Sequence, residues 1–286
     1  MPIDVATALA AEPSRHEASW SAKDVLLYHL GIGAGTPATD QAELRYTYEG
    51  NLQVLPSFLT VIGGGALVGG LGSLPGIDVD LKSVLHGGQE IVVHRPLPAA
   101  ATITTSGRVR AVYDKGRAAV IVLEGSGTLA DGTELYTSLN EIFVRGEGGF
   151  GGERGAATAY PVPDRAPDFT AERPTRGDQA LLYRLSGDRN PLHADPEFAK
   201  AAGFDAPILQ GLCSYGLVLK AVVDTCLDGD AARVRRYRTR FAGIFFPGET
   251  MRVRVWRDAD ARLLVRATAV ERGDAIVLSD CLVEYG

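Results

Sequence analysis

The chain has 286 residues, of which 45% are hydrophobic and 22% are charged, with a formal net charge of -6 and a sequence pI near 5.4. This is an ordinary globular composition, long enough for two domains. The acidic balance argues against a nucleic-acid partner, which usually requires a basic face. No window approaches the ~18 consecutive apolar residues of a membrane-spanning helix, so we expect no membrane association.

The two ends of the chain and its cysteines predict a cytoplasmic protein. Residues 1–15 lack the charged start and apolar core of a signal peptide, and the last residues, EYG, differ from the peroxisomal S-K-L signal. Three cysteines without paired spacing, Cys213, Cys226 and Cys281, predict free thiols and neither a disulfide nor a zinc site. The strong excess of Arg over Lys indicates GC-rich coding, as in an actinobacterium.

The first half of the chain contains four β-rich runs, at 89–97, 102–114, 118–129 and 134–144, several of them with the alternation of half-buried strands. A segment rich in Gly, Pro and Ala follows at 145–169 and indicates a connection between domains. We therefore expect an N-terminal domain at 1–150, a linker at 151–168 and a C-terminal domain at 169–286, each domain of ordinary size.

The second half repeats this order of elements. Residues 211–227, GLCSYGLVLKAVVDTCL, are apolar on nearly every side, as expected of a helix buried on all faces. Four β-rich runs follow it at 233–246, 249–258, 262–271 and 275–285. The two similar halves predict a duplicated α+β fold in which a long helix is wrapped by a curved antiparallel sheet.

Residues 183–195, YRLSGDRNPLHAD, contain the strongest candidate for a chemical site. Asp195 and Pro196 have the pattern of a helix start, which leaves Asp188, Asn190 and His193 in an irregular segment where side chains can converge. Taken one by one, these residues also fit an ordinary turn. His193 is, however, the sole histidine after residue 94.

Gly211 begins the predicted buried helix, so its amide is one of the unpaired donors at a positive dipole end. An acid, a base and an anion-stabilising amide together suit proton transfer next to a carbonyl group.

The segments YRLSGDRNPLHADPEFAKAAGF and PILQGLCSYG resemble the hydratase 2 motif of MaoC-like (R)-specific enoyl-CoA hydratases. The segments DVLLYHLGIGAG, YEGNLQVLPSF, LHGGQ, VYDKG and RGEGGFGG resemble the first half of the two-domain members of that family. The resemblance implies a double hot dog fold, a homodimer, and an acyl-CoA thioester substrate whose CoA takes the place of any cofactor. It implies hydration of trans-2-enoyl-CoA to (3R)-3-hydroxyacyl-CoA in fatty-acid or steroid side-chain β-oxidation, with a separate 3-hydroxyacyl-CoA dehydrogenase as the next enzyme.

Carried onto this chain, the resemblance assigns four catalytic residues. His193 takes a proton from water, Asp188 supplies a proton to C2 on the same face, Asn190 orients the pair, and the Gly211 amide binds the enolate oxygen. Because the pair is coupled, the formal assignment of acid and base stays open.

The resemblance also assigns substrate contacts to His86, Gly87, Lys115 and Phe241. Two of these positions have plain structural alternatives, a hairpin turn at Lys115 and a strand core at Phe241.

Two departures from the family pattern bear on function. Gln210 stands where the family commonly has His before the glycine of the oxyanion site. The first half lacks its own G-D-x-N-P-x-H, which predicts one site per chain and a first domain that holds the acyl chain. The glycine-rich segment 60–76 disfavours a continuous helix and predicts either room for a long or bulky acyl group or a merely flexible loop.

Several rival functions fit the sequence less well. GIGAG (31–35) and GGGALVGG (63–70) lack the strand–helix context of a dinucleotide site, and no G-x-S-x-G elbow is present. A 3-hydroxyacyl-thioester dehydratase of lipid synthesis would run the same chemistry backwards. A non-catalytic acyl-thioester-binding protein would not need Asp188, Asn190 and His193, and a hot-dog thioesterase would not need this loop.

Overall fold

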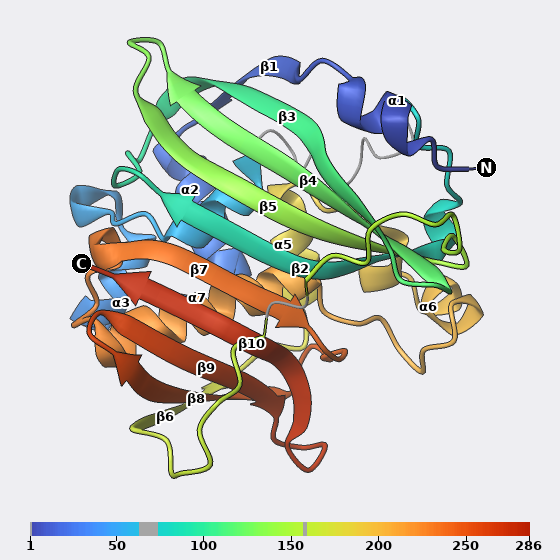
Figure 1. Cartoon of the computed structure of the whole chain (residues 1–286). Coiled ribbons are helices and arrows are strands. Elements are labelled where there is room, and N and C mark those ends of the chain that lie inside the picture. The colour runs from blue at the N-terminus through green and yellow to red at the C-terminus, as the bar shows by residue number, and fades with distance from the viewer. Residues whose placement is uncertain (1, 63–73, 157–158) are drawn as a thin grey trace.

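The computed structural model describes residues 2–62, 74–156 and 159–286. Its strands form one antiparallel sheet in the order β1-β3-β4-β5-β2-β7-β10-β9-β8-β6, and the helices α2, α5 and α7 lie on one side of that sheet (Figure 1).

The strands are β1 (Ser14–Trp20), β2 (Val84–Val93), β3 (Ala101–Asp114), β4 (Ala118–Leu129), β5 (Glu134–Arg145), β6 (Phe169–Pro174), β7 (Val234–Phe241), β8 (Thr250–Ala259), β9 (Arg262–Ala269) and β10 (Ala275–Tyr285). The α-helices are α1 (Val5–Ala10), α2 (Ala22–Gly31), α3 (Gln41–Thr47), α5 (Gln179–Tyr183), α6 (Pro196–Ala201) and α7 (Gly211–Cys226). Short 3₁₀ helices are η1 (Glu49–Asn51), η2 (Pro56–Thr60), η5 (Leu81–Ser83), η6 (Arg184–Ser186), η7 (Pro191–His193) and η8 (Ala231–Arg233).

The strand order shows the duplication directly. Strands β1 to β5 form one half-sheet and β6 to β10 the other, and each half has the same internal order. The halves join where β2 pairs with β7, with Ile91 opposite Tyr237. The predicted duplicated α+β fold is therefore confirmed. The eight predicted strand regions are present, and the two outermost strands, β1 and β6, were not predicted.

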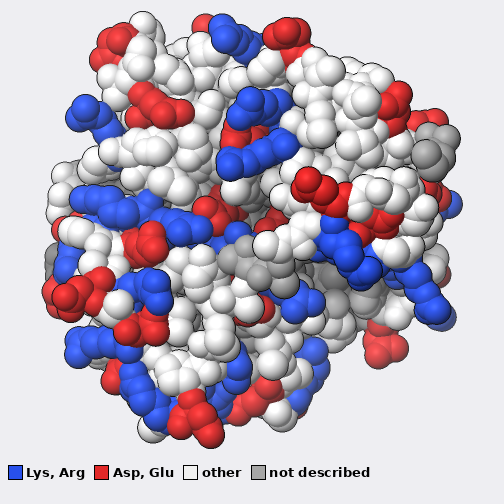
Figure 2. Space-filling view, viewed as in Figure 1, with Lys and Arg blue, Asp and Glu red and all other residues white. Residues whose placement is uncertain are grey.

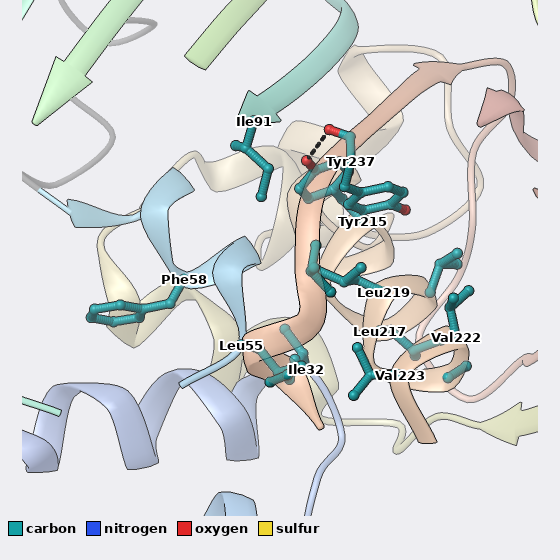
Figure 3. Packing of buried hydrophobic residues seen from close by; sticks show 14 of the residues in the cluster. Ile32, Leu55, Phe58, Ile91, Tyr215, Leu217, Leu219, Val222, Val223 and Tyr237 are labelled. Carbon is teal, nitrogen blue, oxygen red and sulfur yellow. Dashed lines mark hydrogen bonds between the residues drawn. The ribbon is translucent and has the colours of Figure 1, made fainter. Parts of the chain in front are cut away.

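The core of the second half is built on α7. Its residues from Cys213 to Val223 are all buried, as its apolar sequence predicts. Tyr215 on this helix stacks on Tyr237 of β7 with ring centroids 4.1 Å apart, and its hydroxyl donates to the Tyr237 carbonyl at 3.0 Å (Figure 3). Figure 3 also shows Ile32 and Leu55 of the first half beside α7, so the two halves share one apolar core.

The first half offers no counterpart of α7 among the residues that the structure describes. η2 ends at Thr60, and the described chain resumes at residue 74. The glycine-rich segment 60–76, from which we predicted an interrupted helix, falls largely on residues 63–73, which lie outside the described residues.

The connection between the halves is held in place by specific contacts. The Asp114 carboxylate accepts the amides of Gly116, Gly149 and Gly151 at 2.7–2.8 Å. Further along, Tyr160 and Val162 pack against an apolar cluster on the opposite face of the sheet from α7, formed by Trp256, Leu264 and Leu282. The segment between β5 and β6 is thus anchored at both ends.

Positive and negative side chains alternate over the face of the sheet that is seen in Figure 2. At the seam between the halves, Arg236 and Arg238 both contact Glu90, and Arg238 also contacts Glu141. The helices that the structure describes include none long and apolar enough to cross a membrane. Cys213, Cys226 and Cys281 are free thiols, as predicted.

Candidate active site

The loop that carries Asp188 and His193 is shaped by its own backbone. Gly187 has a φ of 127°, a conformation that favours glycine and that turns the chain out of η6. The Asn190 amide donates to Asp188 Oδ1 at 3.2 Å, and Asn190 Oδ1 accepts the amide of Leu192 at 3.0 Å. The side chain of Asn190 thus caps η7. Its backbone N–H group orients the Asp188 carboxylate.

The ring of His193 is buried at the end of η7 and lies next to Asp188. His193 Nδ1 is 2.8 Å from the carbonyl oxygen of Ile208, which can only accept a hydrogen bond. Nδ1 therefore carries the proton, and in the neutral ring Nε2 is a free base. Nε2 lies 3.9 Å from Asp188 Oδ2, too far for a direct hydrogen bond and short enough for both atoms to contact one water molecule.

Burial lowers the pKa of His193 below its usual value of 6.5, and the nearby Arg184 acts in the same direction. The Asp188 carboxylate and the Ile208 carbonyl oppose this shift because they stabilise the protonated ring. The net result is an imidazole that stays neutral, and hence basic, at neutral pH.

Gly211 is the first residue of α7, and its amide has no acceptor within the helix. The ring of Phe241 packs on it so closely that a Cβ added at Gly211 would lie 3.1 Å from Phe241 Cδ1. The His86 ring lies 4.7 Å from that of Phe241. Burial lowers the pKa of His86 to about 4, and its Nε2 makes no hydrogen bond with a described residue.

These groups share one cavity of about 1120 Å³ between the two halves. Its walls include Asp188, Asn190, His193, Gly211, Phe241 and His86. Six of the eight residues predicted from the sequence are therefore brought together, and they come from both halves. No group of three metal-ligating side chains occurs among the residues in the described ranges.

The other two predicted residues lie outside this cavity wall. Gly87 sits at a bulge between β2 and β5, where a Cβ would lie 3.2 Å from the carbonyl oxygen of Glu141. Lys115 occupies the hairpin turn between β3 and β4, and its Nζ donates to the carbonyl oxygen of Arg154. Gln210, the residue in place of the family histidine, is fully buried, and its Nε2 donates to the carbonyl oxygen of Ala180 at 3.1 Å.

Polar residues on the sheet of the first half also line the cavity, and sequence reasoning did not single them out. Gln89 of β2 lies opposite Asn140 of β5. Ser138 comes two residues before Asn140 on β5, and all three residues line the cavity. The alternation in 134–144 could have placed Ser138 and Asn140 on the same face, but only the pairing of β5 with β2 brings them to the site.

The duplicated half-sheets, with an Asp–His pair that shares a cavity with the start of α7, have the architecture of the MaoC-like class of hot-dog proteins. Residues 158–276 match the model of the MaoC like domain, and residues 19–146 match the MFE-2 hydratase 2 N-terminal domain. The chain belongs to this two-domain MaoC-like hydratase family.

Its relatives cover nearly the whole chain. It is 48% identical over 280 residues to the enoyl-CoA hydratase ChsH3 of Mycobacterium tuberculosis, a match that spans 98% of each chain. It is 41% identical over 282 residues to 3-hydroxyacyl-thioester dehydratase Y of the same organism, which spans 93% of each chain.

Solved structures agree on the fold. A MaoC-like dehydratase from Phytophthora capsici superposes with a TM-score of 0.85 at 30% identity, covering 99% of this chain and 98% of that one. A Mycobacterium tuberculosis protein described as a double hotdog fold superposes with a TM-score of 0.56 at 13% identity, over 96% of this chain and 95% of that one, and supports the fold alone. The predicted double hot dog is confirmed.

Proposed function

We propose that this chain is an (R)-specific 2-enoyl-CoA hydratase, which adds water to trans-2-enoyl-CoA to give (3R)-3-hydroxyacyl-CoA. The observation that carries the proposal is the free Nε2 of His193, held 3.9 Å from the Asp188 carboxylate at a cavity that also contains the start of α7. The 48% identity to a protein named enoyl-CoA hydratase supports the same reaction.

The reaction requires one proton to leave water and one proton to reach C2. His193 Nε2 accepts the proton from a water held between His193 and Asp188, and the oxygen of that water forms the new bond at C3. Asp188 delivers one proton to C2, and the proton taken up by His193 passes within the pair to Asp188, so that one proton enters the pair and one leaves it. The pair has the same protonation state before and after turnover. The oxygen at C3 and the proton at C2 add to the same face of the double bond, because His193 and Asp188 lie on one side of the substrate.

Negative charge builds on the thioester oxygen while the C3–O bond forms. The Gly211 amide, at the positive end of the 16-residue helix α7, is placed to donate to that oxygen. One donor of this kind typically contributes about 3 kcal/mol to the barrier. These steps use only groups of the chain, so the proposal includes no metal or redox cofactor.

The size of the cavity supports a long or bulky acyl group, fatty or steroidal. Its volume of about 1120 Å³ exceeds the ~300–1,000 Å³ usual for small-molecule sites. In its wall, Gly107, Gly125 and Ser138 lie opposite one another on three neighbouring strands. Because these three neighbouring positions carry small side chains, no large side chain projects from the sheet there. The space above the sheet is then available to a wide acyl group.

In this proposal, the CoA part of the substrate meets the outer end of the site. His86 and Gly87 contact the thioester arm, and Lys115, on its exposed hairpin, contributes positive charge toward the phosphates of CoA. Lys115 Nζ contacts the carbonyl oxygen of Arg154, which holds its ammonium group at this turn.

A second candidate is a 3-hydroxyacyl-thioester dehydratase of lipid synthesis, because a protein of that name is 41% identical over 93% of this chain. The same residues would then remove water, and the form of the thioester and the direction of flux would separate the two functions. We also propose a cytoplasmic homodimer whose product passes to a separate 3-hydroxyacyl-CoA dehydrogenase.

The deciding experiment follows the loss of enoyl-thioester absorbance over a panel from crotonyl-CoA through long-chain to steroid side-chain enoyl-CoA. Chiral analysis of the product tests the (3R) configuration. Hydration by the wild type, absent in folded Asp188→Asn and His193→Gln variants, is the expected result. Binding of these thioesters without turnover would replace the hydratase with the acyl-thioester-binding protein.

A further inference from the structure

Asn140 and Ser138 are buried polar side chains in the wall of the cavity, away from its catalytic end. Asn140 is 7% exposed and Ser138 is 9% exposed, and both line the cavity. Neither side chain makes a hydrogen bond to any residue in the described ranges. Ile142 and Val144, which follow on the same face of β5, are fully buried apolar residues, so the two polar groups interrupt an apolar surface.

A third polar group adjoins them. Gln89 lies directly opposite Asn140 on the neighbouring strand and is 3% exposed. Its Nε2 donates to the carbonyl oxygen of Glu90 at 3.2 Å, whereas its Oε1 is buried and makes no hydrogen bond to a described residue. All three side chains line the cavity, so the cluster formed by Gln89, Ser138 and Asn140 fits a ligand that brings hydrogen-bonding atoms.

The position of the cluster shows which part of a substrate it meets. Phe241, which packs on Gly211, lies on β7, and β2 stands between β7 and β5 in the sheet. Thr239 is opposite Gln89, and Gln89 is opposite Asn140. Asn140 is thus two strands and two residues from Phe241, which corresponds to roughly 12 Å. At that distance from the thioester, the cluster faces the distal part of an acyl group.

We propose that Asn140 and Ser138, with Gln89 beside them, bind a hydroxyl or carbonyl oxygen on the distal part of the acyl group. The substrates are then oxygenated acyl thioesters rather than plain hydrocarbon ones. Asn140 offers both a donor and an acceptor, and Ser138 offers a hydroxyl, so the cluster accepts either kind of oxygen. All three side chains are uncharged, which suits a neutral oxygen better than a carboxylate. This inference rests on the proposed hydratase function and names the substrate class of the same site.

The test compares matched substrates that differ in one oxygen. Trans-2-decenoyl-CoA is assayed against the same thioester with a hydroxyl group at carbon 8 or 10, and trans-2-dodecenoyl-CoA against the same thioester with a hydroxyl group at carbon 8, 10 or 12. We expect the wild type to prefer one hydroxylated member about tenfold in kcat/KM, which corresponds to ~1.4 kcal/mol. The difference should lie in KM, because a remote contact binds substrate and transition state alike.

Two variants test the residues themselves. Asn140→Leu and Ser138→Ala should each lower or abolish the ratio of kcat/KM between the hydroxylated and the unsubstituted thioester. Asn51→Leu, at an exposed position away from the cavity, is the matched control and should keep the preference. The wild-type ratio and Ser138→Ala keep the test valid if Asn140→Leu does not fold.

The outcomes separate the two proposals. Equal kcat/KM for all members of a pair, or an unchanged ratio in both variants, overturns the assignment of Asn140 and Ser138 while the hydratase stands. If no thioester is hydrated, the proposed hydratase function is wrong. Calorimetry with saturated decanoyl-CoA and 10-hydroxydecanoyl-CoA then tests the binding of a distal oxygen by itself. Tighter binding of the hydroxylated thioester by wild type, lost in the variants, supports it, and equal binding overturns it.

Discussion

His193 Nε2 and Asp188 Oδ2 face each other at 3.9 Å, and each group is held by a contact made by its other polar atom. Asp188 Oδ1 accepts the amide of Asn190, and His193 Nδ1 donates to the carbonyl oxygen of Ile208. The two atoms that face each other, His193 Nε2 and Asp188 Oδ2, make no other hydrogen bond with a described residue, so both are available to one shared water molecule. This arrangement explains the five-residue spacing of Asp188 and His193.

Removal of either member of the pair should abolish most of the activity without unfolding the chain. General acid–base groups typically contribute about 10²–10⁴-fold, so Asp188→Asn and His193→Gln should each lower kcat/KM by that range. The double variant should be little worse than the worse single one, since the two groups act as a unit. Glu197→Gln, on exposed α6, is the matched control. A single variant that keeps a tenth of the wild-type rate would contradict the assignment.

The pH profile of hydration should reflect the low pKa of His193. Its burial keeps the ring neutral below the usual 6.5, and only the neutral ring can accept a proton from water. We expect kcat/KM to hold its plateau through pH 6.5 and to fall only at more acidic values. Measurement of kcat/KM against pH, together with NMR titration of the imidazole, checks this. An acid limb centred at or above 6.5 would mean that the base is another group or that His193 is not desolvated.

The contact between Gly211 and Phe241 predicts a specific effect of a single methyl group. In Gly211→Ala the new Cβ would lie 3.1 Å from Phe241 Cδ1 and Cε1, so either the ring or the start of α7 must move. Because alanine favours a helix more than glycine, stability should not fall, while kcat/KM should drop about tenfold as the oxyanion donor shifts.

Pairing Gly211→Ala with Phe241→Leu should restore part of the lost activity, since the smaller side chain gives the methyl group room. Steady-state kinetics and thermal melts of the two single variants and the double variant form the complete set. No recovery of activity in the double variant would show that the close contact does not limit the position of the amide.

Much of the fold could be read from the sequence, and its limits have physical causes. The strands at 118–129 and 134–144 alternate because one face is buried, whereas β1 has five exposed residues in seven and β6 has none that is buried. Edge strands of this kind leave no hydrophobic pattern to find. For the candidate site, Asp188, His193 and Gly211 lie within one short region of the sequence and were predicted to act together, whereas Asn140 reaches the cavity only through pairings between distant strands.

The VYDKG segment, in which the family resemblance assigned a substrate contact to Lys115, and the RGEGGFGG segment are joined in the structure by Asp114. This carboxylate accepts three backbone amides, and those bonds lower its pKa. In Asp114→Asn one acceptor oxygen becomes a donor, so at least one amide loses its partner. We expect Asp114→Asn to lower Tm and to speed proteolysis near 146–152. Asp131→Asn, on the next hairpin, is the control and should leave the rate of proteolysis near 146–152 unchanged. Equal protease resistance would show that the glycine segment is held by other contacts.

His29 predicts a pH dependence of stability that is independent of catalysis. Its ring is fully buried, with Nδ1 donating to the carbonyl oxygen of Tyr46 at 2.8 Å and Nε2 accepting the amide of Leu55 at 3.2 Å. Burial lowers its pKa from 6.5 to about 4. Between those values the unfolded chain binds a proton that the folded chain does not, so stability falls as the pH drops from 6.5 toward 4 and then levels off, by roughly 3 kcal/mol at most.

Urea unfolding at about pH 7.5 and pH 5 measures this effect. The wild type should lose about 2 kcal/mol more between these two conditions than His29→Gln, which lacks this imidazole and keeps every other titrating group. His16→Gln, at an exposed histidine, should lose as much as the wild type. The His29→Gln variant should also be less stable at pH 7.5, because glutamine cannot place both hydrogen bonds as the ring does. If wild type and His29→Gln lose equal stability on acidification, the ring is already protonated in the fold, and its two backbone contacts must be arranged differently from those described above.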